Sequence, residues 1–316
     1  MVSILIPCFN AERWIGDAIT SALDQTWTET EVIVVDDGST DRSLSIIQGF
    51  GSRIRVESGP NRGGNAARNR LLELASGEWL QYLDADDYLL PGKIAAQMDY
   101  VACHGDIDIV YGPITIDRMS AAGREMLPIP EPRDPWILLA GWWLPQTGAP
   151  LWRKQAVLDV GGWKSGQKVC QEHELYLRLL KASKRFGYCS ENGAVWRLWG
   201  SSSLSLRNAG EVRRHRAVIE QDAEDYLRST GGLTAERHEA INAARFRMAR
   251  VAWREGDRAG ARDLVAAIGQ SAPAFEPTFE EASYRWLWSA FGFEWAEAIA
   301  GWRRQLRALP SPGTSS

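Results

Sequence analysis

Three carboxylates stand directly after a short apolar run, and side chains of this type and spacing can bind a divalent cation. The run, residues 79–83, has the length and residue types of a buried strand, and Asp84, Asp86 and Asp87 follow it. In an open α/β sheet the carboxyl end of a strand opens into the ligand crevice. Hard cations take oxygen ligands and keep phosphates as co-ligands, which makes a metal–phosphate site one interpretation. The alternative is structural, because Asp residues after a strand also form turns or cap helices.

A second acidic strand end and a glycine-rich loop accompany this cluster. Asp36 and Asp37 end another apolar run, and the loop GPNRGGN follows at residues 59–65, with Asn61 inside it and Arg68 behind it. Such a set can hold a nucleoside diphosphate: a carboxylate would accept hydrogen bonds from the base or ribose, and arginine and backbone N–H groups would meet phosphate oxygens. The loop has neither the Gly-Lys-Ser/Thr of a Walker A loop nor the dinucleotide G-x-G-x-x-G. An ordinary strand–helix turn is the alternative.

Hydrophobic periodicity predicts the elements that position these residues. The expected strands cover residues 2–7, 31–36, 53–57 and 79–83, each followed by a helical pattern. This alternation is typical of a Rossmann-like, doubly wound, mostly parallel α/β sheet. Asn10 is expected to cap the first helix, and residues 121–135 are expected to form a polar, proline-rich loop.

The composition changes along the chain and predicts its domain organisation. Residues 1–208 are expected to form the α/β domain, with a first half (1–104) that alternates regularly and a second half (105–208) that does not. Ala- and Arg-rich charged segments predict an all-helical region over residues 209–309, followed by a flexible tail at 310–316.

Charge, cysteines and hydropathy exclude several classes of protein. The 316 residues carry a formal net charge of −4, which gives no electrostatic reason to expect a nucleic-acid partner. The four cysteines have neither metal-ligand nor disulfide-framework spacing, which favours a reducing compartment. A strand is expected from Val2 with no charged segment ahead of it, and no apolar run reaches the ~18 residues of a membrane span. We therefore expect a cytoplasmic protein without a secretory signal.

Four segments together resemble the family 2 glycosyltransferases of GT-A fold, in the order and spacing typical of that family. They read VSILIPCFNAE, EVIVVDDGSTD, PNRGGNAARNRLLELASGEW and LDADDYLLPGK. The resemblance implies an inverting enzyme that uses Mn²⁺ or Mg²⁺. The donor would be a nucleoside-diphosphate sugar, with a UDP-sugar favoured. The acceptor would be a carbohydrate or a lipid-linked sugar in bacterial surface polysaccharide or glycoconjugate assembly.

The resemblance also implies roles for individual residues. It places Asp37 on the base, Asp84 near the ribose or the donor sugar, and Asp86 on the metal. The implied donor-binding residues are Pro7, Phe9, Asn10, Glu12, Asp37, Asn61, Arg68, Asp84 and Ala85.

The catalytic base is expected at the start of a later helix. The family usually carries a Glu-Asp pair there, with an arginine six residues after the Asp. Counted back from Arg178, this frame reads Gln171-Glu172, so Glu172 is the predicted base and Gln171 replaces the first acid. Glu174 is an alternative base, and Glu172 as a first-turn acid that stabilises the helix dipole is the structural alternative.

The acceptor side is expected to include Trp163, His173 and Trp199. Trp199 stands where the family usually has a histidine, and His173 is the neighbour of Glu172, although a single helix histidine is often only structural. The departures at Gln171 and Trp199 motivate a rival hypothesis, a nucleotide-sugar-binding or scaffolding protein that has lost catalysis.

Tryptophan and arginine are concentrated near the end of the chain. Residues 282–309 include Trp286, Trp288, Trp295 and Trp302 together with four arginines. An aromatic and basic helix can lie on an anionic membrane surface or form a homo-oligomer. Packing of these tryptophans onto the catalytic domain is the alternative.

The metal site generates a first prediction. Asp86→Asn is expected to abolish sugar transfer and to leave the fold intact, because a solvent-facing strand-end carboxylate adds little to the core. Transfer assays with and without a chelator, together with circular dichroism, measure both effects. Turnover that resists chelation, or a fully active variant, would remove the metal from the mechanism.

Overall fold

The computed structural model describes residues 1–119, 123–198 and 209–308, which form two compact units. The first unit is Met1–Ile219 and the second is Glu220–Ser316. The division falls within helix α9 (Ala209–Ser229). The expected domain boundary at residue 208 stays a prediction, and each unit is described by itself.

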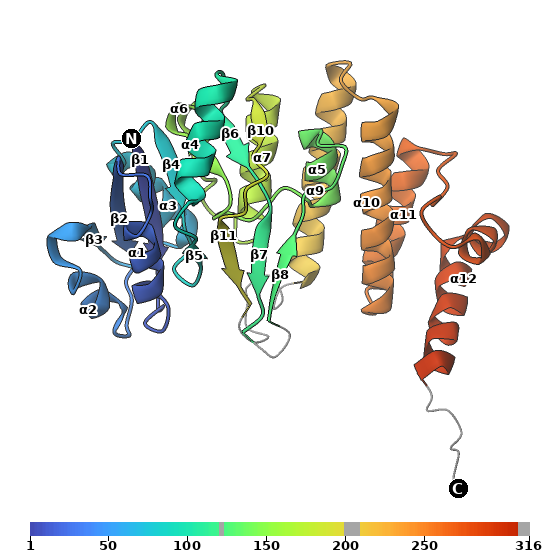
Figure 1. Ribbon diagram of the computed structural model, residues 1–316. Coiled ribbons are helices and arrows are strands. Elements are labelled where there is room, and N and C mark those ends of the chain that lie inside the picture. Colours follow the sequence, from blue (N-terminus) through green and yellow to red (C-terminus); the bar gives the residue numbers. More distant parts are fainter. Residues whose placement is uncertain (120–122, 199–208, 309–316) are drawn as a thin grey trace, which may run out of the picture. The chain divides into compact units, whose positions relative to one another are not determined.

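The first unit is organised around a seven-stranded, mostly parallel sheet, as predicted (Figure 1). Its order is β10-β6-β9-β4-β1-β2-β3. The strands are β1 (Val2–Cys8), β2 (Thr30–Asp36), β3 (Arg55–Ser58), β4 (Trp79–Tyr82), β6 (Ile109–Tyr111), β9 (Leu151–Arg153) and β10 (Phe186–Tyr188). Strand β1 is parallel to both β2 and β4, whereas β9 is antiparallel to β4 and β6.

Burial on both faces explains the continuous apolar sequence of β1. Ile4 and Ile6 pack in one cluster with Ile15 and Ile19 of helix α1, and Leu5, also buried, points to the opposite face. The register pairs the last residue of β1 with that of β2, and β4 ends beside Leu5. The segments that follow β1, β2 and β4 therefore leave the sheet at one edge.

Helices surround this sheet and connect its strands. They are α1 (Ile15–Leu23), α2 (Ser43–Gln48), α3 (Gly64–Leu74), α4 (Lys93–His104), α5 (Pro135–Gly141), α6 (Lys154–Asp159) and α7 (Gln171–Lys181), with a 3₁₀ turn at Gly51–Arg53. The expectation that Asn10 caps the first helix is wrong. Helix α1 begins only at Ile15, and the Asn10 side chain instead accepts a hydrogen bond from the Thr40 backbone N–H at 2.8 Å.

A second, four-stranded sheet lies beyond the regular alternation, in the order β5-β11-β7-β8. Its strands are β5 (Tyr88–Leu89), β7 (Ile114–Asp117), β8 (Arg124–Leu127) and β11 (Ala194–Arg197). Strand β8 lies where a polar loop was expected. It is an exposed edge strand paired only with β7, so its sequence lacks the apolar pattern of a core strand.

The second unit is all helical, as predicted. Helices α10 (Ala235–Arg254) and α11 (Arg258–Ser271) pack as a hairpin. Helix α12 (Ala282–Ala308) is kinked at Gly292, whose φ of +76° lies outside the helical range. Across the described parts of the chain, no helix carries an apolar stretch long enough to cross a lipid bilayer.

Candidate functional site

The carboxylate of Asp37 organises the glycine-rich loop at the edge of the main sheet. Its oxygens accept hydrogen bonds from the backbone N–H groups of Arg62 at 2.7 Å and Gly63 at 2.8 Å. Its own N–H donates to the Cys8 carbonyl at 2.8 Å, so one buried residue joins the ends of β1 and β2 to the loop. Charge-assisted bonds of this kind are stronger than neutral ones. Asp37 thus determines the shape of the loop, whatever else it binds.

A glycine beside Asp37 allows this close approach. Gly38 has a φ of +76°, and a Cβ atom there would lie 2.7 Å from the backbone nitrogen of Asn61. Both the positive φ and the absent side chain are therefore required. Asn61 itself is exposed at the tip of the loop.

The first two motifs of the sequence are tied together by side-chain contacts. Asn10 Oδ1 accepts from the Thr40 N–H, and Glu12 Oε2 accepts from the Arg42 N–H at 3.0 Å. Phe9, which is 50% exposed, and the half-buried Pro7 stand beside them. These positions are open enough to meet a ligand, and their donor-binding roles stay predictions.

Arg68 connects the end of β4 to the beginning of α7. Its Nη2 lies 2.7 Å from Asp84 Oδ1, and its Nη1 donates to Gln171 Oε1 at 2.7 Å. The guanidinium lies over the Trp163 ring, 4.9 Å from its centre. Arg68 is 8% exposed, so these contacts are sheltered from water. Asp84 and Gln171, the neighbour of Glu172, thus contact the same guanidinium group, that of Arg68.

The three carboxylates after β4 have different environments. Asp87 is buried, accepts from the Arg197 N–H at 2.9 Å, and has a pKa raised well above its ordinary value because burial disfavours its charge. Asp84 keeps 30% of its side chain exposed, and Asp86 is half-buried. Ala85 between them is buried. Of the three, only Asp84 and Asp86 keep part of their surface exposed, and their ligand contacts stay predictions.

Asp84 and Asp86 fit the binding of a cation that shares a diphosphate. Mg²⁺-like ions are usually held by one or two carboxylates plus substrate phosphates. Within residues 1–119, 123–198 and 209–308 no group of three or more His, Cys, Asp or Glu side chains forms a full ligand set. One such carboxylate can be enough for an ion that also binds phosphates, and Asp86 as its ligand stays a prediction.

Two glutamates in the first turn of α7, Glu172 and Glu174, also differ in exposure and in their partners. Glu174 is bound by Arg178, with Nε at 2.9 Å and Nη2 at 2.7 Å, so its carboxylate is already paired. Glu172 keeps 23% of its side chain exposed, and partial burial raises its pKa, opposed by the charge of Arg68 and reinforced by that of Asp84. Of the two, Glu172 is the carboxylate that remains open to accept a proton.

Two of the expected acceptor-side residues lie inside the protein. Trp163 is 1% exposed and packs edge-on against Tyr82 at 5.1 Å. His173 is 4% exposed and is stacked on Trp142 at 3.5 Å; desolvation lowers its pKa to about 3 and keeps it neutral. Neighbouring rings cover both side chains, and their expected acceptor-side roles stay predictions. Trp199 lies outside the described residues.

Arg197 is a residue of this region that sequence analysis did not single out for a role. Besides its N–H bond to Asp87, its Nη2 lies 2.9 Å from Asp17 Oδ2, and its guanidinium lies 4.5 Å over the Tyr88 ring. It therefore fastens β11 to α1 and to the segment after β4. In the sequence Arg197 is recognisable only as an arginine directly after Trp196, and this position does not indicate which residues it contacts.

The Arg68 contacts generate a prediction on stability. Arg68→Gln should lower the free energy of unfolding by about 1.5–3 kcal/mol, because it removes a hydrogen bond between charged groups in a sheltered place. The control is Arg70→Gln on the same helix, whose pair with Glu57 is exposed and should matter clearly less. Urea unfolding of both variants measures the difference. Equal losses would mean that the Arg68 bridge does not stabilise the fold.

Comparisons with known proteins agree with this geometry. Residues 3–152 match the model of the family described as "Glycosyl transferase family 2". One curated relative is the UDP-Glc:alpha-D-GlcNAc-diphosphoundecaprenol beta-1,3-glucosyltransferase WfgD of Escherichia coli. It is 33% identical over 131 residues, which are 40% of this chain and 51% of the relative. The chain spans about half or less of the length of the curated relatives it matches.

Two solved structures show the same fold at low sequence identity. Staphylococcus aureus TarS 1–349 in complex with UDP-GlcNAc has a TM-score of 0.57 at 18% identity, covering 79% of this chain and 80% of that one. The mannosyltransferase PcManGT of Pyrobaculum calidifontis, in complex with GDP-Man and Mn²⁺, has a TM-score of 0.53 at 16% identity, covering 96% and 86%. The fold is therefore the GT-A type that was expected. Residues 3–152 therefore resemble glycosyl transferase family 2 in sequence, and the fold of the unit that contains them agrees with that match.

Proposed function

We propose that this chain transfers a sugar from a nucleoside-diphosphate sugar to an acceptor hydroxyl, with inversion at the anomeric carbon. The observation that carries the proposal is the Arg68 bridge from Asp84 to Gln171. It gathers the carboxylates expected at the donor and the helix that bears Glu172 into one site. A donor sugar near Asp84 would then have a candidate base within the same crevice.

The nucleotide would lie along the edge where β1 and β2 end. Pro7, Phe9, Asn10 and Asn61 would line its pocket, and backbone N–H groups of the loop held by Asp37 would meet its polar atoms. A UDP-sugar is favoured because TarS is described with UDP-GlcNAc and WfgD is named for UDP-Glc, although PcManGT is described with GDP-Man. The name of WfgD also supports a lipid-linked acceptor in bacterial polysaccharide assembly.

Asp86 would hold the divalent cation, with Asp84 beside it near the ribose or the donor sugar. A bound Mn²⁺ or Mg²⁺ supplies positive charge that stabilises the departing diphosphate. The Mn²⁺ in the PcManGT complex supports this choice. Arg68 would hold Asp84 in place and add positive charge to the same side of the site.

Glu172 would remove the proton of the acceptor hydroxyl. A carboxylate with a raised pKa is a stronger base, because its pKa lies closer to neutral pH. It must still be ionised to accept the proton. Gln171, in place of the family's usual acid, contributes a neutral oxygen to Arg68, and Glu172, unlike Glu174, has no ion pair with an arginine among the described residues. A cytoplasmic place of action belongs to the proposal, and the four free thiols suit a reducing compartment.

The replaced acid also favours a second candidate, a nucleotide-sugar-binding or scaffolding protein without catalysis. Gln171 cannot act as a base, so the second candidate follows if Glu172 does not take that role alone. Both candidates bind a donor, and only the enzyme breaks its sugar–phosphate bond.

A donor screen tests the proposal. Nucleotide sugars, each with and without Mn²⁺, are compared by thermal shift, and slow donor hydrolysis is then measured for those that bind. A ligand at a hundred times its Kd should add about 2.7 kcal/mol to stability. Metal-dependent binding with hydrolysis is expected; binding without hydrolysis or transfer supports the scaffold, and no binding of any donor contradicts both.

The base generates a further prediction. Glu172→Gln keeps the shape and loses basicity, so it should lower kcat by about 10²–10⁴ with little change in donor affinity. In the unaltered chain kcat should fall as pH drops through the raised pKa of Glu172, because protonation inactivates the base.

The matched control is Glu174→Gln. It breaks the pair with Arg178 and should lower stability more than kcat. If Glu174→Gln instead shows the loss of rate at unchanged stability, Glu172 is not the base.

A further inference from the structure

Helix α12 exposes an unusual number of large aromatic side chains. Trp286, Trp295 and Trp302 are 62–65% exposed, and Phe291 is 55% exposed. Phe291 packs edge-on against Trp286 at 5.7 Å. Trp295 and Trp302 are seven residues apart in the helical part after Gly292, so they share one face. We call these four side chains the α12 aromatic stripe.

A hollow of about 490 Å³ lies beside Trp302, between α10, α11 and α12. The residues that matter for its chemistry are Trp253, Arg254, Arg258, Glu297, Trp302 and Arg304. The three arginines are exposed, whereas the side chain of the one acid, Glu297, is 0% exposed. The hollow therefore presents cations to the solvent and an indole at its rim.

The charges around this hollow do not cancel. Glu297 is contacted by Arg250, which also pairs with Glu280, by Arg254 at 3.5 Å and by Arg304 at 3.6 Å, so two carboxylates serve three guanidinium groups. Arg258 bonds to the Trp253 carbonyl at 2.7 Å and lies 3.7 Å over its ring, and neither contact carries a negative charge.

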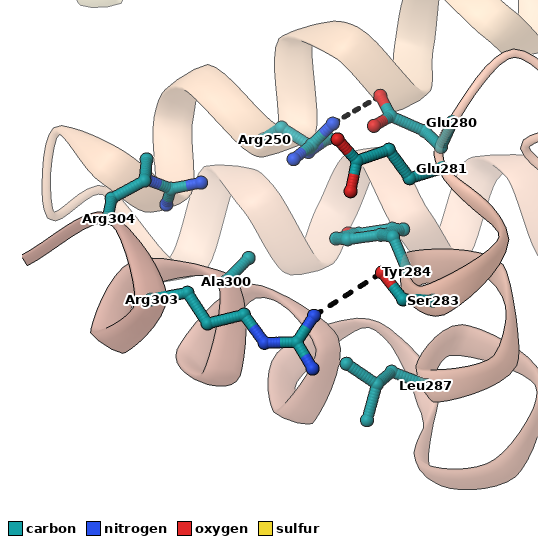
Figure 2. A pocket seen from close by; sticks show the side chains of 9 residues that line it. All are labelled: Arg250, Glu280, Glu281, Ser283, Tyr284, Leu287, Ala300, Arg303 and Arg304. Carbon is teal, nitrogen blue, oxygen red and sulfur yellow. Dashed lines mark hydrogen bonds and ion pairs between the residues drawn. The ribbon is translucent and has the colours of Figure 1, made fainter. Parts of the chain in front are cut away.

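The neighbouring hollow, of about 180 Å³, is lined by three arginines, Arg250, Arg303 and Arg304, and by two acids, Glu280 and Glu281 (Figure 2). There Arg250 pairs with Glu280, while Arg303 donates to the neutral Ser283 Oγ at 3.3 Å. The acid beside the stripe, Glu294, is neutralised by Arg262 at 2.7 Å. Exposed aromatic and cationic groups thus coincide on α12 without an unpaired acid next to Trp295.

We propose that this face of the second unit docks on an anionic phospholipid membrane. Tryptophan favours the headgroup region, where its ring is half-buried and its N–H stays wet. The arginines next to it would contact lipid phosphates, because the negative surface potential of the membrane attracts cationic side chains. Light scattering tests the rival occupant, a second copy of this chain. This inference does not depend on the proposed sugar transfer.

Vesicle sedimentation of the full chain tests the proposal. The vesicles contain either phosphatidylglycerol mixed with phosphatidylcholine or phosphatidylcholine alone, and each is used at low and high salt. The protein is expected to bind the anionic vesicles, to bind less at high salt because ions screen the attraction, and to bind the zwitterionic vesicles much less. A blue shift of tryptophan emission should accompany binding.

Two double variants separate the contributions. Trp295→Ser with Trp302→Ser should lower partitioning several-fold, and these side chains are exposed enough that the fold should persist. Arg258→Gln with Arg303→Gln should lower it on the order of tenfold and reduce its salt dependence. The controls, Trp143→Ser and Arg53→Gln, change exposed residues of the first unit and should bind as the original chain does. Circular dichroism checks that every variant is folded.

Three results would overturn the proposal. The first is no binding of the original chain to anionic vesicles. The second is undiminished binding by the folded tryptophan variant. The third is that the original chain is a dimer in light scattering, the tryptophan variant is a monomer, and neither binds vesicles. The stripe would then be a contact between two copies of the chain.

Discussion

The site depends on one guanidinium group held between two halves of the first unit. Arg68 belongs to α3, yet its partners are Asp84, after β4, and Gln171, at the start of α7, 103 residues further along the chain. Sheltered charge-assisted bonds of this kind are directional, so they set the orientation of both partners at once. Every role proposed for Asp84 and Glu172 rests on this one arrangement. The Trp163 ring beneath the guanidinium gives it a fixed support.

Carboxylates of the same chemical type have different tasks because their surroundings differ. Asp37 accepts bonds from two loop N–H groups and shapes the backbone, and Asp87 is buried and bound to β11. Glu174 is paired with Arg178, and only Glu172 of that turn remains open. Pairing stabilises an ionised carboxylate, whereas partial burial without a partner makes it a stronger base. The division between structural and reactive acids thus follows from solvation and pairing.

The second unit uses arginine in two contrasting ways. Arg245 is 2% exposed and donates to Glu224 at 2.5 Å and to Gln221 at 2.8 Å, so its charge is paired inside the helical core. Arg258 and Arg303 keep their charge at the surface, next to exposed tryptophans. The buried ion pair of Arg245 stabilises the helical core, while the exposed guanidinium groups of Arg258 and Arg303 can contact a partner. This contrast separates the core of the unit from its proposed docking face.

The sequence by itself determined the sheet and the place of the site. Continuous apolar runs such as β1 and β2 are typical of parallel strands buried on both faces, and parallel strands end at one edge, so the segments that carry Asp37, Asp84 and Asp86 were expected at the same edge. Local patterns could not show that Trp163 and His173 are covered, that Asp87 turns inward to a backbone group 110 residues away, or that β8 pairs as an edge strand. These outcomes depend on partners distant in sequence, and burial and pKa are properties of the packed neighbourhood rather than of the residue. Only the tertiary structure decided which of the acids are buried or paired with arginine, and which keep part of their surface exposed.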